Sequence, residues 1–335
     1  MKWESYPGIC LVFRTECKIK TRLTMEKMMK ALSFAEREKL CEEQFDMAGP
    51  FWHLFTDGRG MTDIFISDDE FDLGMVLLAV TVCRAKGVRM VTFELMNNHM
   101  HTILCGAEED CLMLFEDFKS KLKRVIKGTG RPIDWNMFQG KMVKIGDIKQ
   151  LRTEIAYVHR NAFVAQPQYT PYNYPWGGGW CFFNETLKYL DTVGMDKMSY
   201  DKKRSLTHSR DINGLEKLRF IGDRVYIPSF CDIKFGEEMF SDARSYFSIL
   251  TRRAELYGVI ATRIKDSVFL TDDEMFGIAI AYVEKEFGVN KLVLLSPEQR
   301  IRTAKELHFK YNASNQQLRR LLRIEIEVLE ELFPG

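Results

Sequence analysis

The sequence predicts an α+β fold in which helices pack on a largely antiparallel sheet. Segments between residues 51 and 127 follow the order strand, strand, helix, strand, strand, helix. That order is typical of a small layer of helices on a sheet. The first helix has clear boundary signals, because Asp68 or Asp69 suits its N-cap and Gly87 suits its C-terminal stop. From about Met195 the pattern changes, and the last third of the chain is predicted to be mostly helical.

The predicted elements can be placed in order along the chain. The first two strands span 51–56 and 61–67, a helix spans 69–86, strands span 88–96 and 99–105, and a helix spans 108–127. Residues 134–145 are expected to connect to a further helix. That helix, 151–161, has an apolar stripe of Leu151, Ile155 and Val158. Residues 162–185 are rich in Tyr, Pro, Trp and Gly and are predicted to form an ordered loop.

These elements suggest four regions. Residues 1–49 are an N-terminal extension with a helix at 25–44, and residues 50–185 form the domain with the sheet. Residues 186–265 are a linker and helical region, with a polar linker at 201–204, a hairpin at 222–228 and helix within 230–257. Residues 266–335 are an all-α domain with helices at 271–287, 296–311, 314–322 and 325–333.

Composition limits the class of protein. The 335 residues are enough for two or three domains, and the net charge of +1 means that any DNA contact must come from local basic patches. The longest apolar stretch, 74–83, is far shorter than the ~20 residues of a membrane helix, so no membrane partner is expected. The N-terminus lacks the apolar core of a signal peptide. The eight cysteines lack Cys-x-x-Cys spacing, which favours free thiols in a cytoplasmic protein.

The most informative feature is the pair His99 and His101. Side chains two positions apart on a strand point to the same face, so these two imidazoles could hold one metal ion. The alternative is a strand with two polar residues on a solvated side. Tyr157 and Asn161 are four residues apart on the predicted helix 151–161, so they are neighbours on one helical face and could oppose the histidines.

Taken in order, these segments resemble the HUH single-tyrosine transposases, and among them the REP-associated tyrosine transposases. That family has a Met-x-Asn-His-hydrophobic-His strand and a Tyr-Ile-x-x-Asn-Pro helix. The first is matched by Met96, Asn98, His99 and His101, and the second by Tyr157, Val158 and Asn161. Looser matches are Trp52–Gly60 for the first strand of the family, Ile64-Phe65 for the next, and Tyr174-Pro175-Trp176 near the end of the domain.

The chain departs from the family pattern at two places. Ala162 stands where the proline follows the helix asparagine, and Gly177-Gly178 stand where two serines follow the tryptophan. Neither change removes a reactive group, so they bear on substrate contacts more than on chemistry.

The resemblance implies a ferredoxin-like core and a single-stranded DNA substrate, often beside a hairpin. It also implies attack by the tyrosine, which leaves a 5′-phosphotyrosine link and a free 3′-hydroxyl. His99, His101 and the Asn161 oxygen would bind the metal, and such mixed nitrogen and oxygen ligands suit Mg²⁺ or Mn²⁺. Tyr157 would be the nucleophile, although a phenol is only ~0.1% ionised at neutral pH. Whether the protein acts as a monomer or a homodimer is left open.

Three nearby side chains receive no catalytic role. His159 is turned away from Tyr157 by the helix, and Arg160 is expected to be a solvated surface residue. His53, on the first strand, is expected to be structural rather than a ligand.

Basic and aromatic residues are candidates for DNA contacts. One candidate set follows the predicted helix 108–127, and Trp176 could stack on a base. A second set lies in the segment 306–322, which looks like a helix-turn-helix, with Asn312 at the turn and Ser314 as N-cap. The candidates are Lys119, Lys121, Lys123, Arg124, Lys127, Arg131, Arg319, Arg320 and Arg323. The following helix carries Glu325, Glu327, Glu330 and Glu331 and no base, so this module contacts either DNA or protein.

The sequence thus favours a metal-dependent single-strand DNA endonuclease and strand transferase. Two alternatives stay open: a catalytically silent DNA-binding regulator on the same fold, and a metal-dependent phosphoesterase that uses water. Only tyrosine attack requires the hydroxyl of Tyr157.

Overall fold

A four-stranded antiparallel sheet lies at the centre of the molecule. The computed structural model describes residues 32–58, 61–165, 169–251, 270, 272–311 and 313–333. The strands are β1 (Phe51–Phe55), β2 (Arg89–Leu95), β3 (Met100–Cys105) and β4 (Lys141–Ile145), and they lie in the order β2-β3-β1-β4. With α3 (Asp68–Arg84) and α4 (Glu108–Ile126), the chain order is β-α-β-β-α-β. This is the ferredoxin-like arrangement, so the predicted α+β class is confirmed.

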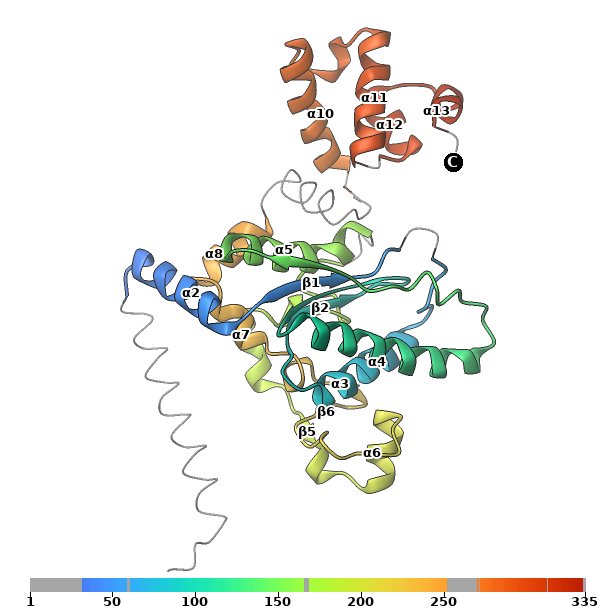
Figure 1. Ribbon diagram of the computed structural model, residues 1–335. Helices are drawn as coiled ribbons and strands as arrows, with labels where there is room; N and C mark the ends of the chain where they lie inside the picture. Colours follow the sequence, from blue (N-terminus) through green and yellow to red (C-terminus); the bar gives the residue numbers. More distant parts are fainter. Residues whose placement is uncertain are drawn as a thin grey trace, which may run out of the picture.

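Helices cover both faces of this sheet (Figure 1). α3 and α4 pack side by side on one face, and α5 (Ile148–Ala165) crosses the other. Strand β1 contributes to both layers, because successive side chains of a strand alternate between the faces. His53 bonds to Glu154 of α5, so Trp52 and Leu54 point toward α3 and α4.

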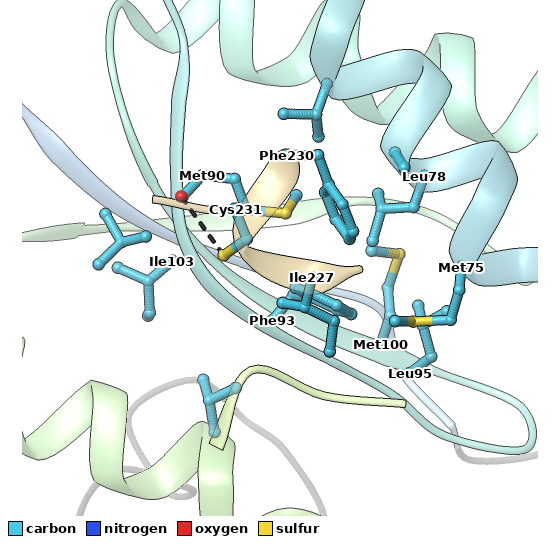
Figure 2. Close-up of a cluster of buried hydrophobic side chains, with 14 of the residues drawn as sticks. Met75, Leu78, Met90, Phe93, Leu95, Met100, Ile103, Ile227, Phe230 and Cys231 are labelled. Carbon is cyan, nitrogen blue, oxygen red and sulfur yellow. Dashed lines mark hydrogen bonds between the residues drawn. The ribbon is translucent and has the colours of Figure 1, made fainter. Parts of the chain in front are cut away.

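The face under α3 is an apolar core. In Figure 2, Phe93, Leu95 and Met100 from the strands meet Met75 and Leu78 from α3. The segment 227–231 closes the cluster, and its Cys231 thiol donates to the carbonyl oxygen of Met90 at 3.5 Å. Each such buried apolar side chain contributes about 1.5–3 kcal/mol. This face therefore stabilises the fold, which leaves the α5 face to carry polar side chains.

The predicted strand 61–67 is wrong. This segment is not a strand in its described part, although Met61, Ile64 and Phe65 are buried. The backbone N–H groups of Ile64 and Phe65 both donate to the carbonyl oxygen of Asn97, at 2.7 and 2.9 Å. The segment therefore packs over the turn between β2 and β3 instead of joining a ladder. The fourth strand is β4, which lies in the region predicted to be a connection.

The N-terminal region packs on the sheet domain in its described part. Helix α2 (Phe34–Ala48) begins with a capping box formed by Ser33 and Glu36. Its Phe45 ring stacks on Phe51 of β1 with centroids 4.9 Å apart. Within the described residues, the predicted helix 25–44 corresponds to α2, which extends to Ala48. Residues 25–31 of the prediction lie outside the described residues.

A small second sheet follows the loop after α5. It joins β5 (Val193–Gly194), β6 (Arg219–Ile221) and β7 (Arg224–Val225) in that order. The predicted hairpin is confirmed between β6 and β7, with Gly222 at φ 59° in its turn. Residues 201–204 are not a linker but part of helix α6 (Tyr200–Thr207), which Ser199 caps. The helical prediction for 230–257 holds in α7 (Ile233–Glu238) and α8 (Ala243–Leu250), and 252–257 lie outside the described residues.

The C-terminal region is all-α in its described part, as predicted. Its helices are α10 (Asp272–Phe287), α11 (Pro297–Tyr311), α12 (Asn315–Leu322) and α13 (Ile326–Leu332). Leu307, Leu318 and Leu329 are fully buried between these helices. Ser314 caps α12 in a capping box with Gln317, as its sequence predicts, whereas Asn312 lies outside the described residues. Across the described residues, no helix has the length and apolarity needed to cross a bilayer.

Candidate functional site

The layer between α5 and the sheet holds several buried polar side chains. His53, His101 and Glu154 are 0% exposed, and Tyr157 and His159 are 2% and 1% exposed. Buried polar groups lower stability unless they are hydrogen-bonded. The hydrogen bonds in this layer therefore determine which nitrogen and oxygen atoms could bind a metal or a substrate.

A chain of hydrogen bonds joins Glu154, His53 and His101. Glu154 Oε2 lies 2.8 Å from His53 Nδ1, and His53 Nε2 lies 3.0 Å from His101 Nδ1. A carboxylate can only accept, so a neutral His53 donates from Nδ1 and accepts at Nε2. His101 must then donate from Nδ1. Its Nε2 is left with a lone pair, which is the form that binds a metal.

The start of α5 holds Glu154 in place. Asp147 accepts the backbone N–H of Gln150 at 2.8 Å, and the Gln150 side chain donates to Glu154 Oε1 at 3.3 Å. Both carboxylate oxygens of Glu154 therefore receive a hydrogen. Glu154 was not predicted to take part in the site, because only its position three residues before Tyr157 pointed to it. His53 is hydrogen-bonded within the protein, in accord with its predicted structural role.

Asn98 orients the second histidine. Its Nδ2 donates to the carbonyl oxygens of Gly58 and Met61, at 3.0 and 2.9 Å, which fixes the amide orientation. Its Oδ1 therefore faces His99 Nδ1 at 2.8 Å, and His99 must donate from that nitrogen. His99, like His101, therefore carries its proton on Nδ1, and its Nε2 is the unprotonated nitrogen. Gly58 is required at this contact, because a Cβ there would lie 2.8 Å from His99 Nδ1.

The two histidine rings have a spacing suited to one shared ion. Their centroids are 5.3 Å apart and their planes cross at 88°. Two imidazoles that bind one ion through Nε2 at the usual bond lengths have centroids about 5 Å apart. His99 precedes β3 and is half-buried, so the pair lies where β3 begins.

Tyr157 lies beside the histidines. Its ring meets His101 edge-on at a centroid distance of 5.5 Å and His53 at 5.8 Å. The side chain is 2% exposed and belongs to a hydrophobic cluster with Phe55 and C-terminal residues that include Leu270. A phosphodiester can reach its hydroxyl only when this cover moves.

Asn161 lies one helical turn after Tyr157 and is 4% exposed. The next residue, Ala162, donates its backbone N–H to Glu94 Oε1 at 2.5 Å, and Glu94 is the cross-strand partner of His101. This hydrogen bond therefore holds the end of α5 against β2, next to His101 of β3. Burial raises the pKa of Glu94 well above its ordinary value. The Asn161 Nδ2 atom is buried and finds no acceptor in the part of the chain that the structure describes.

His159 and Arg160 belong to the same helix. His159 lies between the hydroxyls of Thr92 at 2.6 Å and Tyr246 at 2.9 Å, in accord with the prediction that the helix turns it away from Tyr157. Burial lowers the pKa of His159 to about 3, so it is neutral and structural. Arg160 is 8% exposed, which corrects the expectation of a solvated arginine.

Most candidate DNA contacts lie away from Tyr157. Lys119, Lys121, Lys123 and Arg124 are on α4, on the opposite face of the sheet from α5 (Figure 1), and Lys127 follows directly. Lys121 is paired with Asp117, and Arg131 with Glu70 at 2.7 Å. Arg319, Arg320 and Arg323 are exposed at the end of α12.

Trp176 is not available for stacking on bases. The side chain is 3% exposed, stacks on Phe71 with centroids 4.2 Å apart, and donates its indole N–H to Asp72 at 3.0 Å. The predicted stacking role is therefore corrected, because Trp176 is a core residue that fixes the loop after α5 against α3.

A divalent ion would have to use the two histidines and an amide. Within the described residues, no group of three or more His, Cys, Asp and Glu side chains is arranged to hold a metal. Two imidazoles and an amide oxygen suit a divalent ion, and His99 and His101 each use Nδ1 in a hydrogen bond within the protein. The buried amide of Asn161 could supply an oxygen if its side chain turned.

Comparisons with known proteins give little further information. No family model matches the chain, and no curated protein matches it. One solved structure, described as a REP-associated tyrosine transposase bound to a REP hairpin, is similar at 16% identity with a TM-score of 0.32. The similarity covers 39% of this chain and 77% of that chain. A TM-score this low does not support a functional conclusion.

Proposed function

We propose that this protein is a metal-dependent single-strand DNA endonuclease and strand transferase with Tyr157 as its nucleophile. The observation that carries the proposal is the arrangement around His101. Its Nδ1 is bonded to the Glu154–His53 pair, its ring lies 5.3 Å from that of His99, and Tyr157 meets it edge-on. A nucleophile beside two correctly oriented imidazoles suits phosphodiester chemistry.

In the proposed reaction, the Tyr157 oxygen attacks phosphorus and loses its proton. The new bond joins this oxygen to the 5′-phosphate, and the bond to the 3′-oxygen breaks. The 3′-oxygen takes up a proton and leaves as a hydroxyl. The covalent link conserves the phosphodiester energy, so the reverse attack by a 3′-hydroxyl rejoins a strand without ATP.

His99, His101 and Asn161 would hold Mg²⁺ or Mn²⁺. Such an ion, when bound, stabilises the negative charge that develops on the phosphate oxygens. The protein's own contribution is orientation, since Asn98 and His53 fix which nitrogen each histidine presents. The proposed substrate is single-stranded or hairpin DNA in the cytoplasm. The exposed arginines of α12 are candidate contacts for it.

The test is a denaturing gel of the full chain with labelled single-stranded and hairpin oligonucleotides and Mn²⁺. The proposal predicts a denaturant-resistant adduct that is absent in Tyr157→Phe and His99→Ala. Glu116→Gln, an exposed change on α4, is the control for handling and should leave the adduct intact. Cleavage without adduct that survives in Tyr157→Phe would instead indicate a phosphoesterase that uses water.

A second function is favoured by one observation. Tyr157 is 2% exposed, which is what a catalytically silent DNA-binding regulator on this fold would show. Sequence-specific binding to genomic fragments, with neither cleavage nor adduct under any metal condition, would support this reading.

A further inference from the structure

A basic cleft lies on the side of the sheet remote from Tyr157. It is lined by residues of α3, of α4 and of the turn after α6. Its volume is about 520 Å³, and an adjoining hollow of about 340 Å³ shares His208, Ser209 and Arg210 with it. Sites for small molecules commonly have volumes of ~300–1,000 Å³.

The charge of the cleft is strongly unbalanced. Five basic side chains line the two hollows, against the two acids Asp201 and Asp211. The basic residues are Arg84, Lys121, Arg124, Arg204 and Arg210. Because the whole chain has a net charge of only +1, this local excess of cations is a specific feature of the cleft.

Two of these cations are already used to build the wall. Arg84 bonds to the carbonyl oxygen of Asp211 at 2.5 Å and to the Ser209 hydroxyl at 3.3 Å, and so holds the turn after α6 against α3. Lys121 is paired with Asp117. In contrast, Arg124 and Arg210 pair with no carboxylate among the described residues. Guanidinium groups bind phosphate oxygens in a bidentate way, so these two are the ligand-binding candidates.

The cleft also has an apolar floor. Leu77 and Val80 of α3 line it and are 2% and 1% exposed. The cleft volume of about 520 Å³ is much larger than a phosphate needs, so a nucleoside would fill the rest of the cleft while its phosphate meets Arg124 and Arg210. The Ser209 hydroxyl and His208 add neutral hydrogen-bonding groups.

We propose that this cleft is a nucleotide-phosphate site, filled either by a free mononucleotide or by one nucleotide unit of a nucleic-acid strand. The site lies across the sheet from α5, so its occupancy requires neither Tyr157 nor a divalent ion. The proposal therefore stands or falls separately from the proposed strand transfer.

The test measures fluorescence anisotropy of the full chain in EDTA with two probes, a labelled nucleoside monophosphate and a labelled short oligonucleotide. Unlabelled nucleoside and inorganic phosphate serve as competitors. The variant Arg124→Ala/Arg210→Ala should weaken binding of the probe that fills the cleft at least about tenfold, since two charge-assisted bonds are lost. Lys86→Ala removes an exposed charge just beyond α3 and should change affinity less than about twofold.

Each outcome decides the question. Monophosphate binding lost in the double variant identifies a free nucleotide, and loss confined to the oligonucleotide identifies a strand. Tyr157→Phe should bind like the native chain in either case. If neither probe loses more affinity in the double variant than in Lys86→Ala, the cleft is not a nucleotide-phosphate site.

Discussion

Replacing Glu154 by Gln tests whether the buried hydrogen-bond chain sets the metal-binding form of His101. Both Glu154 oxygens accept a hydrogen, one from His53 at 2.8 Å and one from Gln150 at 3.3 Å. A Gln side chain has one oxygen and one amino group, so it can satisfy only one of these donors. If the amino group faces His53, that ring must accept at Nδ1 and donate from Nε2. His101 would then accept at Nδ1 and carry its proton on Nε2, where it cannot bind a metal.

The expected loss follows from the bond that is broken. A hydrogen bond to a charged acceptor contributes about 1.5–3 kcal/mol, and 1.4 kcal/mol is a factor of ten. Glu154→Gln should therefore weaken Mn²⁺ binding about 10–100-fold, the range usual for such supporting residues. Titration calorimetry of the full chain measures this affinity, with Glu116→Gln as the matched exposed control.

Long-range nitrogen NMR adds a readout that does not depend on the metal. The native protein should show His101 protonated at Nδ1, and the Glu154→Gln variant should shift it toward Nε2. Unchanged Mn²⁺ affinity and an unchanged His101 tautomer in a folded variant would refute the reasoning, because the hydrogen-bond chain would then have no effect on the ligand.

Three further predictions concern other parts of the domain. Gly58→Ala should weaken Mn²⁺ binding in calorimetry, because the added Cβ would lie 2.8 Å from His99 Nδ1 and displace that ring. Trp176→Ala should lower the free energy of unfolding in urea by about 3–5 kcal/mol, since a buried indole bonded to Asp72 is lost. Stability should fall as the pH drops from about 6.5 toward 3, by up to about 1.4 kcal/mol per pH unit from His159, whose pKa in the folded chain is lowered to about 3.

The sign of the pH effect follows from proton binding. Between these pH values the unfolded chain protonates His159 and the folded chain does not, so acid favours unfolding. Glu94 acts in the opposite sense, because its raised pKa gives stability at low pH that is lost as the pH rises. Comparison with His159→Gln therefore isolates the histidine. If the unfolding free energy depended on pH equally steeply in the native protein and in His159→Gln, the assignment of this effect to His159 would be contradicted. An unaltered unfolding free energy in Trp176→Ala would contradict a core role for that indole.

Elements with strong boundary signals were predictable from the sequence. Ser314 caps α12 in the structure as its sequence predicts. The predicted cap of α3 is wrong, because Ser67 rather than Asp68 or Asp69 accepts the backbone N–H of Glu70. Strand β4 was missed because its edge position leaves lysines at 141 and 144, and such a short, charged segment resembles a connection. The predicted strand 61–67 failed for the opposite reason: its apolar residues are buried by packing over a turn, not by pairing.

The placement of the candidate residues on one strand and one helix was predictable, but the hydrogen bonds that orient them were not. The spacing of His99 and His101, and of Tyr157 and Asn161, follows from strand and helix periodicity. The contributions of Glu154, His53 and Asn98 depend on contacts between segments 40 to 101 residues apart, which periodicity does not reveal. Trp176 was misassigned because an aromatic residue in a loop can either pack in the core or stack on a bound base. Only its burial in the structure distinguishes these two roles.

The most direct test of the proposed function is mass spectrometry of the chain after reaction with a single-stranded oligonucleotide and Mn²⁺. Trypsin releases the peptide Thr153–Arg160, in which Tyr157 is the only tyrosine. Tyrosine transfer predicts that this peptide carries a nucleotide through its 5′-phosphate, with the modification on Tyr157. Cleaved DNA together with an unmodified Thr153–Arg160 peptide under conditions that preserve the phosphotyrosine bond would contradict the proposed mechanism.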